Sequence, residues 1–269
     1  MSDRDVGKVR EFWDDRARRA DVPTGEVTHR DVWQRWLEVE TIRRYLRPSD
    51  RVLDVGCGNG FTTWRIAPLV REVVGIDFSR EMVERARVER PADTAAPAAA
   101  AISFAVCDVT ALTPSSFGAF DAAISERCLI NLAGWPEQQQ AIANIAAVVR
   151  PGGRFVFVEG SAEGRANLNR LRERVGLEAF PTVWHNRDFV EAELLPFLDQ
   201  FFEIEERRHF GVYDFVSRVV HPMVVAPAPP EYDSRFNEVA ARLARERQAF
   251  EDLSRVLFLV LKRKVSGGD

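Results

Sequence analysis

From residue 51 onward, short apolar runs alternate with stretches of helical periodicity. Runs of Val, Ile and Phe without polar alternation are typical of strands covered on both faces, as in parallel sheets. The pattern predicts seven strands, at 51–55, 72–76, 102–107, 120–125, 154–159, 201–210 and 255–263. Helices are predicted between them at about 60–67, 79–90 and 136–149. This alternation predicts an α/β fold with a doubly wound, mostly parallel sheet and helices on both faces.

Two helices are predicted before the first strand. Apolar residues recur at helical spacing over 6–20. A second helix is expected to begin near Thr28, because Thr28 and Asp31 have the spacing of a capping box, with Asp in place of the usual Glu. Residues 1–47 are therefore predicted to form an N-terminal helical lid on a core that spans 48–160.

Residues 161–269 complete the predicted fold. Helices are expected around 168–175 and 186–195. The last two strands are separated by 211–254, a segment much longer than the roughly 2–5 residues of a hairpin connection. We predict a helical insertion there, with helices around 214–220 and 234–251. The Ala-rich segment 91–101 has low complexity and is expected to be an exposed connection.

The glycine-rich stretch RVLDVGCGNGFTT, residues 51–63, carries the strongest chemical signal. A predicted strand runs directly into Gly56, Gly58 and Gly60, and a helix is expected just beyond. Glycines at this point let a ligand lie against main-chain atoms that a Cβ atom would block. A dinucleotide fingerprint would need glycine where Phe61 stands, and the P-loop pattern is absent, so NAD and ATP are both disfavoured.

Acidic residues follow the next two predicted strands. Asp77 ends the second strand, where a carboxylate can accept hydrogen bonds from ribose hydroxyl groups. Asp108 ends the third strand, where it can accept from an exocyclic amino group while the Val109 N–H donates to the adjacent ring nitrogen. Because the carboxyl ends of parallel strands meet at one edge, these residues predict a nucleoside-binding crevice.

Four segments together resemble a known family. VLDVGCGNG, GIDFSREMVERA, CDV and PGGRFVFVE, in this order and separation, are similar to the successive motifs of class I S-adenosylmethionine-dependent methyltransferases. The resemblance covers about residues 51–160. It implies a Rossmann-like sheet whose seventh strand is antiparallel and lies between the fifth and sixth, with S-adenosylmethionine as the cofactor.

The resemblance also implies roles for individual residues. The methionine part of the cofactor is assigned to Asp54 and to the loop residues Gly56, Cys57, Gly58, Asn59 and Gly60. The ribose is assigned to Asp77, the adenine face to Phe78 and Met82, and the adenine edge to Asp108 and Val109. The segment SERCLINL, residues 125–132 and thus including Ser125 and Glu126, corresponds to the path between cofactor and acceptor. Trp13 belongs to a lid-like first helix, and Arg30 is a candidate for binding the cofactor carboxylate.

The expected reaction is in-line methyl transfer to an oxygen or nitrogen atom of a small-molecule acceptor. A sulfonium methyl group is already activated, so alignment and exclusion of water are the main requirements, and no metal is expected. His185 is the first candidate for a general base, with Asn186 capping the helix that follows it, and Glu126 is the second. Three alternatives stay open: a non-catalytic S-adenosylmethionine-binding subunit, an aminopropyl transferase and an NAD oxidoreductase.

Composition limits the kinds of partner and the cellular compartment that we expect for this protein. The formal net charge of −4 argues against a nucleic-acid partner. Three cysteines without CxxC spacing argue against a disulfide framework and a zinc site, and so favour the cytoplasm. The charged start of the chain and the absence of a long apolar run argue against a secretory signal and a membrane span. Segments such as EGSAEGRANLNRLR resemble bacterial methyltransferases. The acceptor and the oligomeric state stay open.

Overall fold

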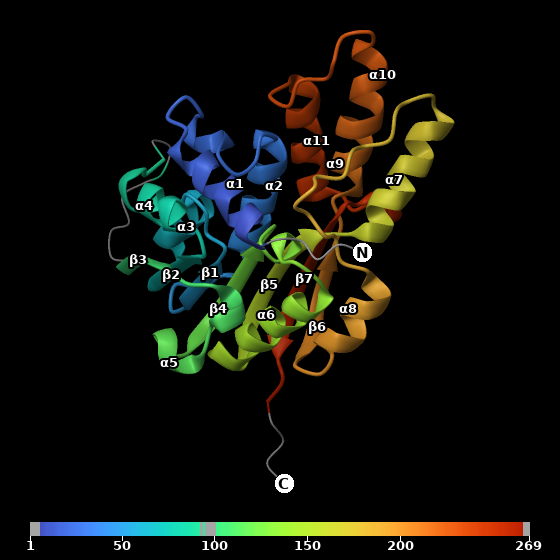
Figure 1. Ribbon diagram of the computed structural model, residues 1–269. Coiled ribbons are helices and arrows are strands. Elements are labelled where there is room, and N and C mark those ends of the chain that lie inside the picture. The colour runs from blue at the N-terminus through green and yellow to red at the C-terminus, as the bar shows by residue number, and fades with distance from the viewer. Residues whose placement is uncertain (1–5, 92–93, 95–100, 266–269) are drawn as a thin grey trace.

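The computed structural model describes residues 6–91, 94 and 101–265. Seven strands form one sheet in the order β3-β2-β1-β4-β5-β7-β6 (Figure 1). They are β1 (Arg51–Val55), β2 (Glu72–Asp77), β3 (Ala101–Val106), β4 (Phe120–Glu126), β5 (Val149–Gly160), β6 (Phe202–Arg208) and β7 (Val256–Arg263). Among these seven strands, β7 runs antiparallel to its two neighbours, β5 and β6, and the other pairs are parallel. The predicted sheet is confirmed, although β5 begins at Val149 rather than at residue 154.

Burial explains why the strands were recognisable. The central strands β1, β2 and β4 are buried at most positions on both faces, and their sequences are correspondingly apolar throughout. The edge strands β3 and β6 contain more exposed positions. Continuous apolar runs thus mark the middle of the sheet, as expected for parallel strands covered on both sides.

Helices cover both faces of the sheet, as predicted. One face packs against α6 (Trp135–Val148) and α8 (Glu191–Leu198). The opposite face packs against α2 (Val32–Ile42), α3 (Phe61–Ile66), α9 (Gly211–Phe215) and α11 (Arg235–Glu246). The remaining helices are α1 (Val6–Arg18), α4 (Arg80–Val88), α5 (Pro114–Phe117), α7 (Ala162–Arg174) and α10 (His221–Val225).

The helical insertion between β6 and β7 is confirmed. A π-helical stretch, Val216–Val220, joins α9 to α10, so the first helical segment is longer than the predicted 214–220. α11 packs on both α2 and α9. Figure 1 shows α10 and α11 standing beside α1 and α2, so the insertion and the N-terminal helices are neighbours in space.

Two predicted helix starts are wrong. α2 begins at Val32, because Asp31 itself is the N-cap and accepts a hydrogen bond from the Gln34 backbone N–H at 3.0 Å. Thr28 therefore does not begin that helix. α8 begins at Glu191 rather than near residue 186, so Asn186 does not cap it.

Two further expectations concern other parts of the chain. Within the described ranges, no helix combines the length and apolar character that a bilayer-spanning segment needs. The predicted exposed connection 91–101 falls largely on 92–93 and 95–100, which lie outside the described residues.

Candidate active site

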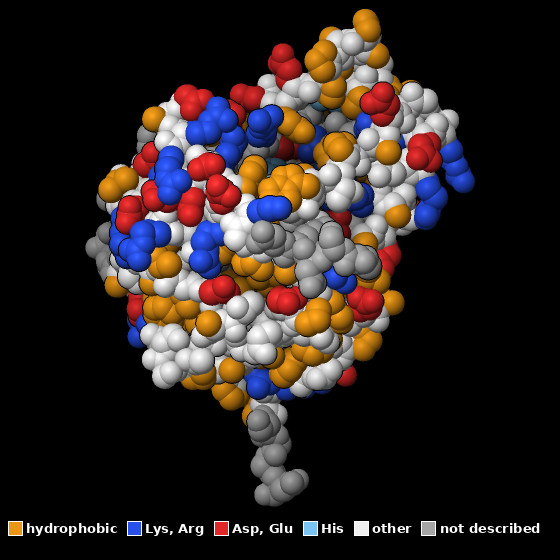
Figure 2. Space-filling view, viewed as in Figure 1, with side chains coloured by type: hydrophobic (Ala, Val, Ile, Leu, Met, Phe, Trp, Pro, Cys, Tyr) orange, Lys and Arg blue, Asp and Glu red, His pale blue; other side chains and the backbone are white. Residues whose placement is uncertain are grey.

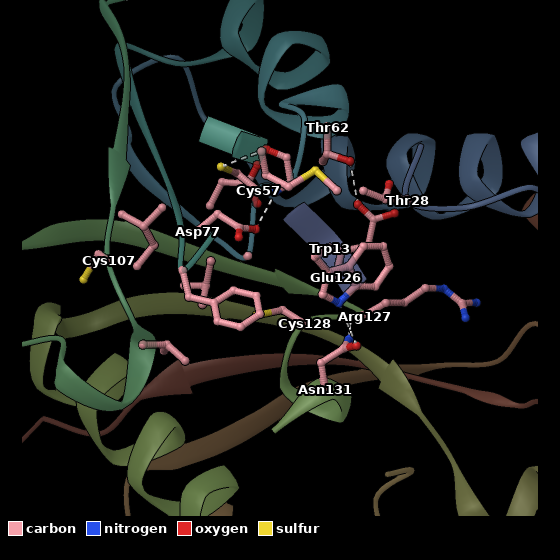
Figure 3. A pocket seen from close by; sticks show the side chains of 18 of the residues that line it. Trp13, Thr28, Cys57, Thr62, Asp77, Cys107, Glu126, Arg127, Cys128 and Asn131 are labelled. Atoms are coloured by element: carbon pink, nitrogen blue, oxygen red, sulfur yellow. Dashed lines mark hydrogen bonds between the residues drawn. The ribbon is translucent and has the colours of Figure 1, made fainter. Parts of the chain in front are cut away.

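A cavity lies at the carboxyl ends of β1, β2, β3 and β4 (Figure 3). It encloses about 1080 Å³ of empty space, its open mouth included. The residues proposed from sequence that line it are Trp13, Asp54, Gly56, Cys57, Gly58, Asp77, Phe78, Met82, Asp108, Val109 and Glu126. Adjacent strands lie about 4.8 Å apart, so the order β3-β2-β1-β4 sets their side chains in a row along the sheet edge.

The glycine loop brings backbone close to this cavity. Gly56 and Gly58 have φ values of +70° and +52°, which L side chains rarely adopt. A Cβ atom on Gly56 would overlap the Cys128 side chain, and one on Gly58 would lie 2.8 Å from Thr28 Cγ2. The loop therefore accepts only glycine at these two positions.

Two buried carboxyl groups flank the loop. Asp77 accepts backbone hydrogen bonds from Gly58 at 2.9 Å and from Ser79 at 2.8 Å, one on each oxygen. Asp54 accepts a hydrogen bond from the Thr63 hydroxyl group. Burial raises the pKa of each carboxyl group to about 6, so both are ionised at neutral pH. Each Asp77 oxygen keeps a lone pair, which can accept a hydrogen bond from a ligand.

Arg35 is a buried cation of the cavity that sequence analysis missed. Its side chain is 5% exposed, stacks over the Phe61 ring at 3.5 Å from the centroid and donates to the Gly25 carbonyl oxygen at 3.0 Å. Burial lowers its pKa to about 10, so it stays charged at neutral pH. Among the described residues, no carboxylate lies within 4.0 Å of it. Glu126, Glu38 and Asp54 are near enough to act on its charge, but none forms an ion pair with it, so the guanidinium group can bind an anionic group of a ligand.

Glu126 lies at the end of β4 beside a second glutamate. It accepts a hydrogen bond from the Thr62 hydroxyl group at 2.6 Å and is close enough to the fully buried Glu38 for the two carboxyl groups to influence each other's ionisation. Burial, and then the charge of Glu38, raises the pKa of Glu126 to about 8. Burial disfavours ionised Glu38, but an ion pair with Arg127 at 2.7 Å holds its pKa below the usual range. At neutral pH the pair therefore carries one proton, mainly on Glu126.

The residue that follows Glu126 has a strained backbone conformation. Arg127 has φ +53°, a left-handed conformation that non-glycine residues rarely adopt. Its guanidinium group is bound by Glu38, and its carbonyl oxygen accepts a hydrogen bond from the Asn131 side chain at 2.8 Å. Strained residues that are held by several contacts are frequent at functional sites. Five residues of the segment 125–132 line the cavity: Glu126, Arg127, Cys128, Asn131 and Leu132.

Three of the proposed binding residues lie behind the lining. Asn59 is fully buried and donates to the Thr24 carbonyl oxygen at 2.8 Å. Gly60, with φ +76°, is the N-cap of α3. The Ser125 hydroxyl group donates to the buried carboxylate of Glu159. These contacts hold the loop and the end of β4 in position, and direct cofactor binding by the three residues stays a prediction.

Arg30 and His185 also lie outside the lining. Arg30 is exposed. His185 is 6% exposed, and its ring packs against Phe12 and Trp13 at centroid distances of 4.6 and 5.3 Å. His185 is not among the residues that line the cavity, but it packs against Trp13, which is. Its role as a general base stays a prediction without support from its position.

Comparison with known proteins agrees with this geometry. The methyltransferase domain family matches residues 52–153. A demethylmenaquinone methyltransferase from Symbiobacterium thermophilum is 31% identical over 156 residues, 57% of this chain and 59% of that protein. The enzyme of the same name from Renibacterium salmoninarum is 31% identical over 67% of this chain and 70% of that protein.

Among solved structures, magnesium protoporphyrin IX methyltransferase from Synechocystis PCC 6803 with bound SAH shares the fold. Its TM-score is 0.63 at 19% identity, over 97% of this chain and 100% of that one. The match to the Symbiobacterium relative spans less than two thirds of that protein's length, whereas the Renibacterium match exceeds two thirds. The extent of these matches shows that the chain belongs to the class I S-adenosylmethionine-dependent methyltransferases.

Proposed function

We propose that the chain transfers a methyl group from S-adenosylmethionine to an oxygen or nitrogen atom of a small-molecule acceptor. The observation that supports this most strongly is that Asp77 and Arg35 line one cavity together with Gly56 and Gly58 of the glycine loop. Asp77 ends β2, whereas Arg35 is close to Asp54 and to Glu126 on β4. The cofactor carries ribose hydroxyl groups for a carboxylate and a methionine carboxylate for a guanidinium group.

The other lining residues fit the same cofactor. The side chains of Phe78 and Met82 offer apolar surface beside Asp77 for an adenine ring. One Asp108 oxygen accepts from the backbone N–H and hydroxyl group of Thr110, at 2.9 and 2.7 Å. The other oxygen lies 4.0 Å from the Arg10 guanidinium group, beyond hydrogen-bond distance, and can accept from an amino group. The glycine loop offers main-chain atoms to the methionine part.

The chain's own residues have three tasks in this proposal. S-adenosylmethionine supplies a methyl group that is already activated on sulfur. Arg35 and Asp77 hold the two ends of the cofactor, which aligns it for in-line transfer. Trp13, hydrogen-bonded to Asn131, covers the cavity and excludes water. Glu126 is favoured over His185 as the proton acceptor, because Glu126 lines the cavity and His185 does not.

Two observations support a small molecule as the methyl acceptor. Two relatives are named as demethylmenaquinone methyltransferases. On the face shown in Figure 2, basic and acidic side chains are interspersed over α1 and α4, without the basic surface that a nucleic-acid backbone requires. The atom that accepts the methyl group and the identity of the acceptor are the open parts of the proposal.

Calorimetry with S-adenosylhomocysteine and with NADH tests the cofactor. We expect S-adenosylhomocysteine to bind and NADH not to bind. Arg35→Met is expected to lower the affinity at least about tenfold, since a charge-assisted hydrogen bond contributes about 1.5–3 kcal/mol. Arg30→Met is the matched control and should leave the affinity unchanged, because Arg30 is exposed outside the lining.

Binding of NADH alone, or equal affinities in wild type and Arg35→Met, would contradict the proposal. Incubation with S-adenosylmethionine labelled in the methyl group and a panel of metabolites then separates an enzyme from a non-catalytic subunit. A labelled methyl product is expected. No methyl transfer, but transfer of the aminopropyl group from decarboxylated S-adenosylmethionine, would instead indicate an aminopropyl transferase.

A further inference from the structure

Two carboxyl groups, Glu38 and Glu126, lie beside each other at the cavity. Glu38 projects from α2, is fully buried and is bound by Arg127, the residue after Glu126, while Glu126 ends β4 and lines the cavity. Two neighbouring carboxyl groups inside a protein do not both ionise readily, because the second charge is opposed by the first and by the loss of solvent. The pair therefore holds a proton that is within reach of the cavity.

Charged groups surround this pair on several elements. Arg35 on α2 faces Glu126, and Asp54 on β1 approaches it from the neighbouring strand. Arg127, next to Glu126 in the chain, is bound to Glu38 by both Nε and Nη2. His29, before α2, interacts with Glu38, and its burial lowers its pKa to about 4, which keeps it neutral. On α3, the neutral Thr62 donates to the Glu126 oxygen.

The pair lies where the reacting end of the cofactor would be. Asp108 and Asp77 follow β3 and β2, and so the nucleoside is assigned to that side of the cavity. The methionine part then extends over the β1 loop toward β4, whose last residue is Glu126. A positive charge on sulfur would therefore lie close to this carboxyl pair.

We propose that Glu38 and Glu126 share one proton before the cofactor binds and lose it when the cationic cofactor enters. Cofactor loading then produces the carboxylate that accepts a proton from the methyl acceptor. This inference rests on the proposed function. The raised pKa of Glu126, about 8, supports it, because a nearby positive charge favours ionisation of a group that is still protonated at neutral pH.

Protons and electrons balance over the cycle. Binding of the cofactor sends the Glu126 proton to solvent and leaves a carboxylate. When the acceptor's oxygen or nitrogen atom forms its bond to the methyl carbon, the carbon–sulfur bond breaks and its electron pair stays on sulfur. The proton that the acceptor loses passes to Glu126, which restores the protonated pair. Glu126 is thus the catalytic residue, and Glu38 with Arg127 are positioning residues that set its protonation.

The experiment counts protons released on ligand binding and needs no acceptor. Titrations at pH 7.5 are repeated in buffers of different ionisation enthalpy, with S-adenosylmethionine and with S-adenosylhomocysteine, which lacks the sulfonium charge. At pH 7.5 a group with a pKa of about 8 is about three-quarters protonated, so wild type is expected to release about 0.5–0.75 proton more than Glu126→Gln when S-adenosylmethionine binds. The excess should be smaller with S-adenosylhomocysteine. Asp54 and Asp77, with pKa values of about 6, are already ionised at this pH.

Two further variants are compared with wild type and Glu126→Gln. Glu38→Gln removes the neighbouring charge, the second cause of the raised pKa of Glu126 after burial, so that pKa should fall and proton release at pH 7.5 should be smaller than in wild type. Glu84→Gln changes an exposed carboxyl group on α4 and should release as many protons as wild type. Should Glu126→Gln fail to fold, Thr62→Val replaces it. This variant removes a hydrogen bond that favours ionised Glu126, and it should move the release to higher pH.

Equal proton release by wild type and Glu126→Gln, with both ligands binding, would overturn this inference and leave the proposed function standing. Failure of both ligands to bind the wild-type protein would overturn the proposed function itself. Wild-type release that persists in Glu38→Gln would also contradict the shared proton, because Glu126 would then titrate independently of its neighbour.

Discussion

The Trp13 indole nitrogen donates a hydrogen bond of 3.2 Å to the Asn131 side-chain oxygen, although the two residues are 118 positions apart. Trp13 belongs to α1, and Asn131 belongs to the short turn after β4. Both side chains line the cavity (Figure 3). The first helix is thereby attached to the segment beside Glu126, so opening of α1 requires this bond to break.

Trp13→Phe is expected to speed the dissociation of S-adenosylhomocysteine. The substitution keeps an aromatic ring against His185 but removes the donor to Asn131. A hydrogen bond contributes about 1 kcal/mol, which corresponds to a dissociation rate about fivefold higher. Stopped-flow displacement measures the rate. Trp184→Phe is the control, because Trp184 contacts the same ring but is 53% exposed and does not line the cavity. A rate unchanged by Trp13→Phe would mean that this bond does not hold the lid.

Gly56→Ala and Gly152→Ala separate backbone strain from steric overlap. Both glycines have positive φ values, +70° and +76°. An added Cβ atom at Gly152 meets nothing within 4 Å, so strain alone should cost about 1–2 kcal/mol. At Gly56 the same atom overlaps the Cys128 side chain as well. We expect Gly56→Ala to lower the melting temperature further and to abolish S-adenosylhomocysteine binding, while Gly152→Ala still binds. Equal losses in the two variants would argue against the close approach of the loop to Cys128.

The sheet was predictable from sequence because its signals are local. Apolar runs indicated the seven strands, and the glycines at 56 and 58 mark a turn that needs positive φ within a few residues. Asp77 was predictable for the same reason, since it directly ends a strand. Parallel strands necessarily bring such ends to one edge.

The positions of Arg35, Glu38 and His185 depend on tertiary contacts that the spacing of residues in the sequence does not encode. Arg35 faces the cavity and Arg30 does not, because α2 begins only after Asp31 and its packing sets which arginine points inward. Glu38 meets Arg127 across 89 positions of the chain. His185 was expected at the start of a helix, but α8 begins later and the ring packs behind Trp13. Charged residues inside an apolar helix pattern were the available signal for Arg35 and Glu38.

Arg218→Met tests the contact between the insertion and the start of α2. Arg218 forms a buried ion pair with Asp31, which also accepts a hydrogen bond from the Tyr213 hydroxyl group. Without Arg218 the Asp31 charge would stay buried and uncompensated, which typically costs about 3–5 kcal/mol. A large fall in melting temperature is expected by calorimetry.

Arg19→Met is the matched control for this comparison. Arg19 forms an ion pair of 2.6 Å with Asp21, but both side chains are more than half exposed. Solvent-exposed pairs contribute little to stability, so its melting temperature should equal that of wild type. If the two variants lost the same stability, burial of the Arg218 pair would not be the reason for its contribution.

Glu126→Gln, without ligand, should change how stability depends on pH. Burial, and then the charge of Glu38, holds the pKa of Glu126 at about 8 in the folded chain, above its ordinary value of 4.5. The folded state therefore binds this proton more tightly than the unfolded state does. Its contribution to stability is complete below about pH 4.5 and is lost progressively as the pH rises through 8.

The amide side chain of the variant would stay neutral throughout, so between pH 6 and 9 the melting temperature of wild type should fall more than that of the variant. The extra fall should be at least about 2–4 °C, the shift that corresponds to 1 kcal/mol in a chain of this size. Glu84→Gln, which changes an exposed carboxyl group, should follow the wild-type curve. Parallel curves for wild type and Glu126→Gln would show that Glu126 is already ionised at pH 6, and a carboxyl group in that state has no proton for the cofactor to displace.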